Sequence, residues 1–470
     1  MQKRPSIFLQ MKRFRRGLKS KAKRKSMIRS HMKLEVQNSA LLRIGKNIHS
    51  YQDALKTFLP TSLTYLLGCS NSPFYISNLK KYDYKDYVPL IVPENFSIIE
   101  NERITIDFLK HLVSVLFWQS CRTFRLDYSK CKYCDLATQV FLDSILKDYS
   151  SFIRRCEKSK VKGNQIGLNI SSIGGNNIHE ESIQRLINSV GSPVVLNNRK
   201  YQNKFVIPYK LRYYEAKESK GAQLMGQKEI DATTLIEYLD NCLSRLCKKL
   251  TADAKQALGY ILGETLSNAE EHSSLHNRYL IGYFEETKQK ENHYGLLNVV
   301  IMNYGKTIYE KFKNPEEGIP FNKKCQEQMK DLSDSFRSRN IFKKDEFTEE
   351  TLWTLYSLQG GVSCIPPEVR KRGNGTIHFI DSFFKIKGSA DADNISKMIL
   401  WSGKSRIEFD GTYQIIEKND ENEGKIGIMP FNKSGMITEK PDSKYVFSTD
   451  TYFPGTMIYA KLLINDDDTI

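Results

Sequence analysis

The residues best suited to chemistry in this sequence lie within one predicted helix, Thr251–His272, which reads TADAKQALGYILGETLSNAEEH. Within it, Glu264, Asn268 and His272 are four residues apart, so each lies only about 40° around the helix axis from the one before. A carboxylate, an amide and an imidazole therefore form a line along the edge of the apolar stripe. Polar groups in such a position need partners when they are buried.

A magnesium–phosphate group would supply those partners. Asn268 offers a hard oxygen ligand to Mg²⁺, and Glu264 can orient or deprotonate a water molecule that attacks a terminal phosphate. The helix alone leaves a structural alternative open, in which the polar line is hydrogen-bonded to neighbouring backbone.

Three later segments favour the nucleotide interpretation. Tyr279–Phe284 and Leu296–Met302 read as strands joined by a hairpin, and the second runs into Asn303-Tyr304-Gly305. Arg372-Gly373-Asn374-Gly375-Thr376 precedes a helical pattern, and such glycines let backbone N–H groups approach a phosphate at a helix N-terminus. Near the end, Pro454-Gly455-Thr456 opens an apolar strand.

Taken in order, these segments resemble the four boxes of the GHKL ATPases, the class of gyrase, heat-shock chaperone, histidine kinase and MutL. ETLSNAEEH resembles the N box, and VVIMNYGKTI is similar to the box in which a strand ends in Asp-x-Gly-x-Gly. RGNGTIHFI is similar to the Gly-rich box, and GTMIYAKL to the closing strand. The resemblance covers about 230–465, roughly half of the chain.

The resemblance implies an α+β fold, a two-layer α/β sandwich of the GHKL (Bergerat) type in which a layer of helices packs against a mixed sheet, with ATP and Mg²⁺ as cofactors. It implies roles for matching positions only. These are Glu264 as the general base, Asn268 as the Mg²⁺ ligand, His272 within the ATP site, Asn303 and Gly305 at the adenine, Gly373 and Gly375 at the phosphates, and Thr456 near the adenine.

The sequence departs from the family pattern in three places. Only three residues separate Glu264 from Asn268, one fewer than in the N box. The acid that reads adenine is replaced by Asn303, whose carbonyl oxygen still accepts a hydrogen bond but carries no charge. Thr307 replaces the second glycine of that box.

The stretch between Lys306 and Arg372 would form the ATP lid, with a hinge at Gly360-Gly361.

The N-terminal half predicts a separate α/β domain. We place a helical segment at 34–87, with helix over Leu41–Leu67, an α/β domain at 88–220, and the GHKL domain at 228–467. In the α/β domain, predicted strands and helices alternate as in β–α–β units. The elements that we expect are strands at Phe96–Ile99 and Thr123–Tyr128, helices at Ile104–Phe117, Leu136–Leu146 and Glu180–Ser189, a loop at Asn164–Asn177 and a polar connection at Asn198–Lys220.

Two segments of this domain, VPENFSIIEN and FRLDYSKCKYCDLA, are similar to STAS-like domains. The resemblance implies an interaction module for a protein partner that the sequence does not identify. Asp127 and Ser129 are either a recognition or phosphorylation point or a solvated turn. Cys131 and Cys134 form a C-x-x-C that is either a metal or redox site or a pair of buried thiols.

Charge and composition limit the remaining possibilities. The net charge is +17, and residues 1–33 hold thirteen Lys and Arg without a single acid. Such a segment repels itself and is expected to be disordered. It would contact nucleic acid or an acidic surface, form a solvated tail, or precede a true start at Met11, Met27 or Met32. The sequence contains no run of about 18 apolar residues, so we expect no transmembrane helix. Its nine cysteines form no tight framework, which indicates a reducing compartment.

We therefore expect a cytoplasmic, bacterial protein that binds ATP and Mg²⁺ and uses nucleotide to switch an interaction surface, with slow hydrolysis. One alternative is a serine kinase of the anti-sigma-factor kind, which has the same ATP site. Another is a nucleic-acid-associated clamp that uses residues 1–33. A homodimer remains open, and no membrane partner is expected.

The tail gives a first testable prediction. Deletion of residues 1–33 should leave both the ATP affinity and the melting temperature unchanged, because a self-repelling segment takes no part in the core. Calorimetric titration and thermal unfolding of the two proteins check this. A clear loss of thermal stability would show that the segment is docked.

Overall fold

The structure is a computed structural model. It describes residues 42, 44, 47–81, 87–118, 123–160, 172–194, 203–215, 221–272, 274–289, 292–314, 320–339, 346–360, 395–420 and 424–465. The chain divides into two compact units. One consists of residues 1–60 and 148–169, and the other of residues 61–147 and 170–470.

In the smaller unit, helix α2 (Tyr51–Phe58) begins with a capping box in which Ser50 and Asp53 each accept a hydrogen bond from the other's backbone N–H. The single helix expected over Leu41–Leu67 is wrong. The next helix, α3 (Thr61–Gly68), belongs to the larger unit and is separate. The two helices are interrupted at Leu59, whose backbone is extended, because the proline that follows disfavours helical geometry in the residue before it.

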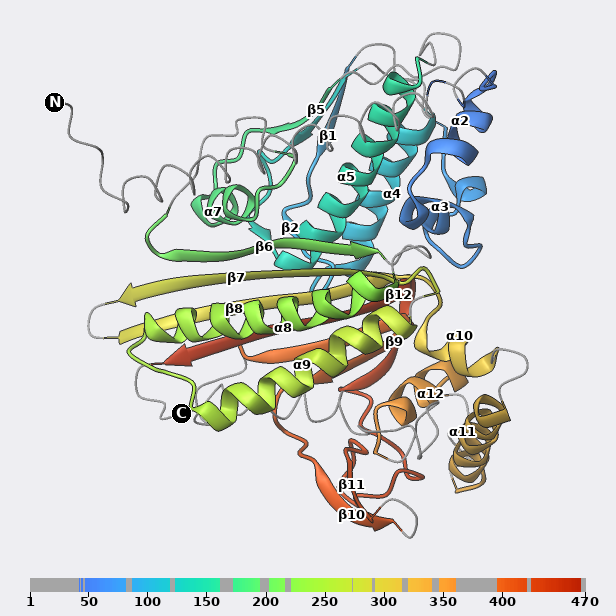
Figure 1. Cartoon of the computed structure of the whole chain (residues 1–470), viewed down its shortest axis with the longest axis vertical. Coiled ribbons are helices and arrows are strands. Elements are labelled where there is room, and N and C mark those ends of the chain that lie inside the picture. Colours follow the sequence, from blue (N-terminus) through green and yellow to red (C-terminus); the bar gives the residue numbers. More distant parts are fainter. Residues whose placement is uncertain are drawn as a thin grey trace, which may run out of the picture. The chain divides into compact units, whose positions relative to one another are not determined.

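The larger unit is built on a five-stranded sheet in the order β6-β7-β8-β12-β9 (Figure 1). Its strands are β6 (Val206–Glu215), β7 (Asn277–Gln289), β8 (Asn292–Tyr304), β12 (Val446–Asn465) and β9 (Lys397–Phe409). The predicted hairpin and closing strand are confirmed. Each pairing is antiparallel, so the expectation of a mixed sheet is wrong. The expectation that Asn198–Lys220 is only a polar connection is also wrong, because this stretch contains β6.

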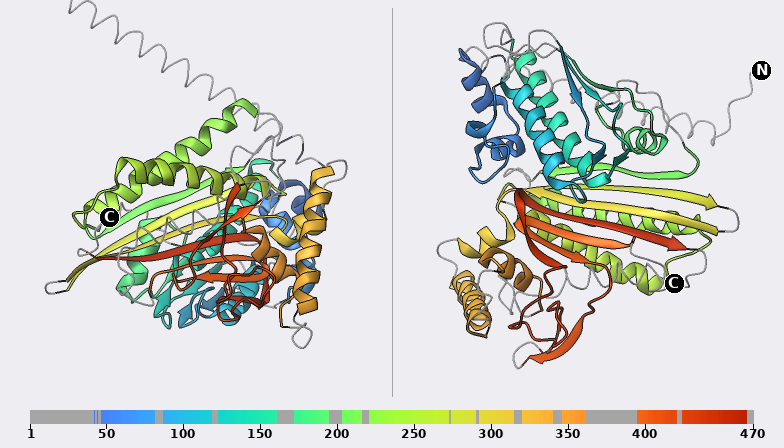
Figure 2. Two further views of the ribbon diagram at one scale, coloured as in Figure 1. Left: turned by 90° about the horizontal axis from the view of Figure 1, so that it is seen from below. Right: turned by 180° about the vertical axis from the view of Figure 1, so that it is seen from behind.

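Two helices, α8 (Gly221–Ser244) and α9 (Ala252–His272), lie side by side across one face of this sheet (Figures 1 and 2). The predicted start of α9 is confirmed, since the Thr251 hydroxyl accepts the Ala254 N–H at 3.1 Å. Leu258, Leu262 and Leu266 of α9 are buried in one core with the strands. Their spacing of four residues keeps them on one side of the helix, and each stabilises the packing by about 1.5–3 kcal/mol.

The same unit contains a smaller α/β layer. Its parallel sheet β1-β3-β5 consists of β1 (Tyr87–Ile91), β3 (Thr123–Asp127) and β5 (Ser172–Asn176). The crossover helices are α4 (Glu102–Trp118) and α5 (Leu136–Lys158), of which α5 belongs to this unit only up to Lys147; α7 (Glu181–Val190) follows. The expected β–α–β pattern is confirmed, and so is the helix cap at Gly191, with φ of 71°. The strand expected at Phe96–Ile99 is wrong beyond Phe96, because the chain turns there and the Ser97 hydroxyl accepts the Glu100 N–H at 2.9 Å. The short parallel pair of β2 (Asn95–Phe96) and β4 (Tyr133–Cys134) completes the layer.

Strand β5 corrects the expectation of a loop at Asn164–Asn177. Gly175 fits a tightly packed position, because a Cβ there would lie 2.3 Å from Val194 Cγ1. The Gly175 N–H also donates to the Val194 carbonyl at 2.8 Å. The remainder of the predicted loop up to residue 171 lies outside the described residues.

Several hydrogen bonds join the α/β layer to the antiparallel sheet. Buried Arg406 of β9 donates to the Ile99 carbonyl at 2.8 Å, and Glu102 at the start of α4 accepts the Thr451 N–H at 2.9 Å. One face of the sheet is therefore covered by α8 and α9, and contacts on the other come from the α/β layer.

The described residues between β8 and β9 include three helices, α10 (Ile308–Lys313), α11 (Pro320–Arg339) and α12 (Glu349–Ser357). Leu352, Trp353 and Tyr356 of α12 are buried with the core of the sheet. The expected lid from Lys306 to Arg372 is therefore wrong for this part, because a lid that opened here would expose core. Residues 361–394, with Gly361 of the predicted hinge, lie outside the described residues.

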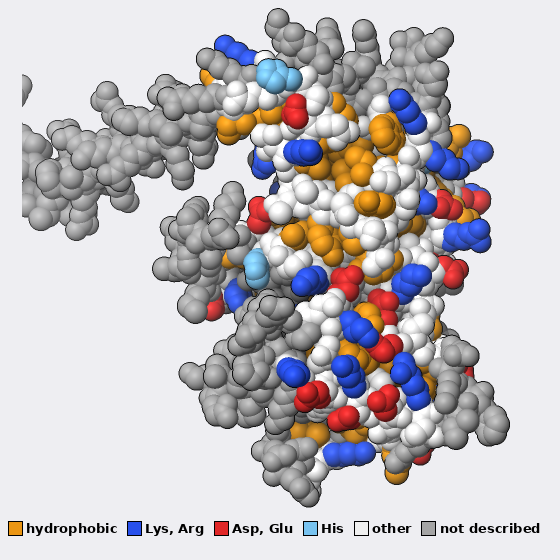
Figure 3. Space-filling view, turned by 90° about the vertical axis from the view of Figure 1, so that its right-hand side faces the viewer, with side chains coloured by type: hydrophobic (Ala, Val, Ile, Leu, Met, Phe, Trp, Pro, Cys, Tyr) orange, Lys and Arg blue, Asp and Glu red, His pale blue; other side chains and the backbone are white. Residues whose placement is uncertain are grey.

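Charges of both signs alternate on the surface of these helices. Lys313 and Arg337 both pair with Glu349, at 2.6 and 3.6 Å, and Figure 3 shows Lys and Arg side chains interspersed with Asp and Glu on this face. Two further strands, β10 (Ile416–Asp420) and β11 (Gly424–Ile428), form an antiparallel pair. Of the helices in the described ranges, none has the length and apolar character that crossing a membrane requires.

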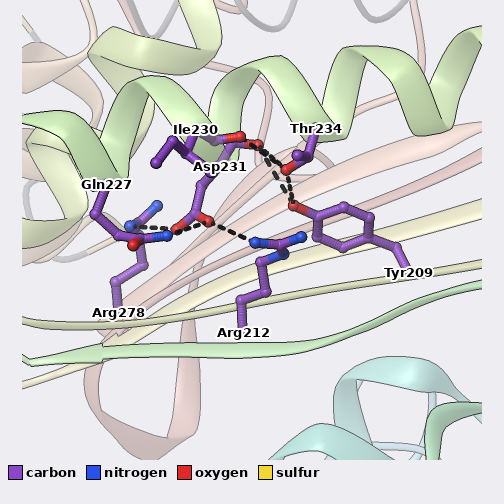
Figure 4. A network of polar contacts seen from close by, with 7 residues as sticks. All are labelled: Tyr209, Arg212, Gln227, Ile230, Asp231, Thr234 and Arg278. Atoms are coloured by element: carbon purple, nitrogen blue, oxygen red, sulfur yellow. Dashed lines mark hydrogen bonds and ion pairs between the residues drawn. The ribbon is translucent and has the colours of Figure 1, made fainter. Parts of the chain in front are cut away.

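A buried ionic network ties α8 to the edge of the sheet (Figure 4). The carboxylate of Asp231 accepts hydrogen bonds from Arg278 at 2.8 Å, Arg212 at 3.1 Å and Gln227 at 2.9 Å. The side chains of Arg278 and Asp231 are only 1% and 3% exposed. Such a pair depends on both partners, because removing one of them takes a charge-assisted contact from the other in a site with little access to water.

Replacing the carboxylate tests this network. Asp231→Ala should lower the free energy of unfolding by about 3–5 kcal/mol, the usual cost of breaking a buried ion pair by removing one partner. Denaturant unfolding measures the effect. The control is Glu94→Ala, which breaks a pair with Lys132 whose side chains are 65% and 70% exposed and should not shift the midpoint measurably. Equal, small effects of both changes would contradict the role of Asp231.

Candidate functional site

The candidate site lies at the end of β8, where three strands bring polar side chains into one row. Asn303 of β8 is directly opposite Thr456 of β12, and Thr456 is directly opposite Ser402 of β9. Asn303 and Ser402 are buried, and Thr456 is half-buried. Residues far apart in the sequence thus form a continuous polar row across the sheet.

The alternation of side chains along a strand decides which face the row occupies. Two positions away on the same three strands, Ile301, Ile458 and Leu400 pack into the core that includes Leu262 of α9. The polar row therefore lies on the face covered by α8 and α9. On this face, the apolar side chains beneath the helices give way at the strand ends to the polar row, whose groups can form hydrogen bonds.

The Ser402 hydroxyl fixes the hydrogen bonding within the row. It accepts the Ile308 N–H at 3.0 Å, donates to the Gly455 carbonyl at 3.1 Å, and lies 2.9 Å from the Thr456 hydroxyl. A serine hydroxyl has one proton and two lone pairs, so its proton is used at Gly455 and Thr456 must be the donor between the two hydroxyls. Thr456 is thereby left as an acceptor toward any further group.

The backbone at the row is held in a conformation that requires glycine. Gly305 has φ of 136° and Gly455 has φ of 152°, a region that residues with a Cβ rarely enter. A Cβ on Gly455 would lie 2.0 Å from the carbonyl oxygen of Asn303. The pairing of β12 with β9 is irregular at this point, between Phe453 and Thr456, as is common beside functional sites.

The C-terminal turn of α9 is joined to the same strand end. The hydroxyl of Ser274, two residues beyond the helix, accepts the Lys306 N–H at 3.1 Å, and Asn277 accepts the buried Tyr304 N–H at 3.0 Å. The end of the predicted N-box helix and the Asn303–Gly305 segment are therefore neighbours. Both bonds use side chains that the sequence analysis did not single out.

The predicted site residues divide into three groups. Asn303, Gly305 and Thr456 are brought together at the row. Glu264, Asn268 and His272 lie on the unbroken helix α9, so their four-residue spacing is kept in the backbone, and their side chains lie outside the described residues. Gly373 and Gly375 also lie outside the described residues.

Two glutamates beside the row were missed from the sequence. Glu310 accepts the Thr307 N–H at 3.0 Å and the Tyr452 hydroxyl at 2.8 Å. Glu350 accepts the Lys404 N–H at 2.8 Å, and burial, reinforced by the charge of Glu310, raises its pKa. The T-x-x-E spacing of Thr307 and Glu310 is a capping-box signal that could have located the first of them.

The described residues do not favour a metal or redox role for the C-x-x-C pair. Burial raises the pKa of Cys131 to about 12 and also raises that of Cys134, so both thiols stay protonated and are poor nucleophiles and ligands. In the described ranges, three or more His, Cys, Asp or Glu side chains nowhere gather as a metal site would need.

At the carboxyl end of β3, Asp127 accepts hydrogen bonds from the Ser129 N–H and the Asn177 amide, each at 3.0 Å. These contacts account for both residues as a strand-end turn.

Comparison with known proteins adds nothing to this geometry: no family model, curated protein or solved structure matches the sequence significantly.

The close contact at Gly455 gives a prediction for the row. Gly455→Ala should lower the free energy of unfolding by about 1–3 kcal/mol, the usual cost of forcing atoms into a packed site. The matched control is Gly263→Ala in α9, where a Cβ meets nothing within 4 Å, and it should raise stability by about 0.5–1 kcal/mol. Denaturant unfolding compares the two, and a Gly455→Ala protein as stable as the wild type would contradict the contact.

Proposed function

We propose that this chain is an ATP-binding protein of the GHKL class that binds nucleotide with Mg²⁺ between α9 and the polar row. The observation that carries the proposal is the pairing of Asn303 with Thr456 at the end of β8, on the face covered by α9. These two positions were assigned to adenine from separate sequence motifs that are about 150 residues apart. Their direct opposition in space is what a shared adenine site requires.

The row has the chemistry to recognise adenine without a charge. The amide of Asn303 offers an acceptor and two donors, so it can accept from the exocyclic amine and donate to the adjacent ring nitrogen. Thr456 offers a second acceptor, because its proton is used at Ser402. Asn303 thus replaces the single charged acceptor of the family pattern with a two-point neutral contact.

The metal and phosphates would be held next to the row by α9 and the Gly-rich segment. Asn268 would provide the oxygen ligand for Mg²⁺, His272 would lie within the site, and the N–H groups at Gly373 and Gly375 would hold phosphate oxygens. The unbroken helix of α9 and the Ser274–Lys306 hydrogen bond support this arrangement. Bound Mg²⁺ would neutralise charge on the phosphates, and Glu264 would orient the attacking water.

In this account nucleotide binding controls an interaction surface, and hydrolysis resets it. The α/β layer, proposed as STAS-like, is the candidate surface, because it belongs to the same compact unit as the site and is hydrogen-bonded to its sheet.

Two variants of α9 separate binding from hydrolysis. Asn268→Ala should weaken Mg²⁺-dependent ATP binding with little effect on stability. Glu264→Gln should keep the ATP affinity within a few-fold and lower hydrolysis by about 10²-fold or more, the scale for loss of a positioned base. Calorimetric titration and phosphate release measure the two effects.

The control is Glu270→Gln, the same change on the same helix outside the four-residue line, which should leave both properties unchanged. Unchanged ATP binding by a folded Asn268→Ala protein would overturn the metal assignment. Label from γ-phosphate-labelled ATP that remains on the protein would identify a kinase instead of a hydrolase.

A further inference from the structure

Tyr304 links the proposed nucleotide site to the opposite face of the sheet. It follows Asn303 directly on β8, so the two side chains point to opposite faces. Tyr304 is fully buried, and its hydroxyl lies 2.6 Å from the hydroxyl of Ser144 on α5. Ser144 uses its one proton on the Phe141 carbonyl at 2.7 Å, so Tyr304 is the donor in this bond.

Aromatic packing holds the Tyr304 ring on several sides. The ring centroids of Tyr279 and Phe141 lie 5.5 and 5.9 Å away, and Phe453 is stacked on it at 6.4 Å. Phe141 and Phe453 also contact each other at 5.6 Å. Since packed interiors yield little to displacement, a movement of α5 at Ser144 must be followed by Tyr304.

The strand end transmits that movement to the polar row. The N–H groups of Tyr304, Gly305 and Lys306 donate to Asn277, Pro454 and Ser274, at 3.0, 3.3 and 3.1 Å. These bonds fix the segment that carries Asn303. The peptide plane between the two residues contains the Cα atoms of both Asn303 and Tyr304. A shift of Tyr304 therefore also displaces the Cα of Asn303, and with it the side-chain amide.

We propose that the Tyr304–Ser144 hydrogen bond couples α5 of the α/β layer to the nucleotide site, so that a protein bound to this layer changes ATP affinity by moving α5. The inference rests on the proposed function. Tyr304 is here a positioning residue, because it acts through Asn303. The coupling is reciprocal: nucleotide bound at Asn303 shifts the position of α5 and so the affinity for the partner.

A double-mutant cycle on the full chain tests the coupling. Tyr304→Phe and Ser144→Ala should each weaken binding of Mg²⁺–ATP by about 2- to 10-fold, the range for loss of one hydrogen bond. The double variant should be no weaker than either single variant, because both changes remove the same interaction. Unchanged affinity in Tyr304→Phe, or fully additive losses, would overturn the proposal.

The matched control is Tyr459→Phe. It removes another buried tyrosine hydroxyl of the same sheet, one that donates to Asn298 at 2.8 Å, away from the polar row. This variant should lose similar stability and keep the wild-type ATP affinity. A loss of affinity equal to that of Tyr304→Phe would show that the effect is general weakening of the sheet, and would overturn the coupling.

Amide hydrogen exchange without nucleotide distinguishes a failure of the coupling from a failure of the proposed function. Ser144→Ala should speed exchange at Gly305 and Lys306 by about 2- to 10-fold, the scale for one hydrogen bond, and leave the amides of α8 unchanged. If the wild type binds no nucleotide, the proposed function fails. The exchange rates of the Gly305 and Lys306 amides then decide whether Ser144 on α5 is coupled to the end of β8. Unchanged exchange at these two amides overturns it.

Discussion

The placement of β12 between β8 and β9 is the constraint on which the rest of the structure depends. It sets Thr456 opposite both Asn303 and Ser402, and the approach of Gly455 to the Asn303 carbonyl leaves no room for a side chain. A slip of one residue along β12 would turn its apolar side chains to the wrong face. The polar row therefore exists because the core beneath α8 and α9 permits one register.

The alternation of side chains along β8 places the proposed nucleotide site and its proposed control on opposite faces of the sheet. Odd-numbered positions, ending in Asn303, contribute to the core under α9 and then to the proposed nucleotide site. Tyr304 faces the other way and is bonded to α5. The proposed binding chemistry and its proposed control are thus carried by adjacent residues of one strand.

Much of this architecture follows from the sequence, because strong periodic patterns determined it. The spacing of Leu258 and Leu262 gave the buried side of α9, and the hairpin and the β–α–β units were found by the same reasoning. Strands β1, β5, β6, β9, β10 and β11 were missed. Glycine is typical of loops, but Gly175 of β5 is there because of close packing. Strand β6 has an irregularity between Tyr209 and Arg212 that breaks its alternation.

The candidate site could be predicted only in part. Motifs located Asn303, Gly305 and Thr456, because each belongs to a local pattern. Ser402, Ser274 and Asn277 were not predictable, since their hydrogen bonds depend on strand order and on contacts between segments far apart in the sequence.

The most direct test of the account is a calorimetric titration of the wild-type protein with a non-hydrolysable ATP analogue, with Mg²⁺ present and then with Mg²⁺ removed by a chelator. The account predicts one saturable site per chain that is weakened when the metal is removed, because the ligand set proposed on α9 acts through Mg²⁺. Absence of saturable binding by the folded protein at millimolar analogue would contradict the central claim.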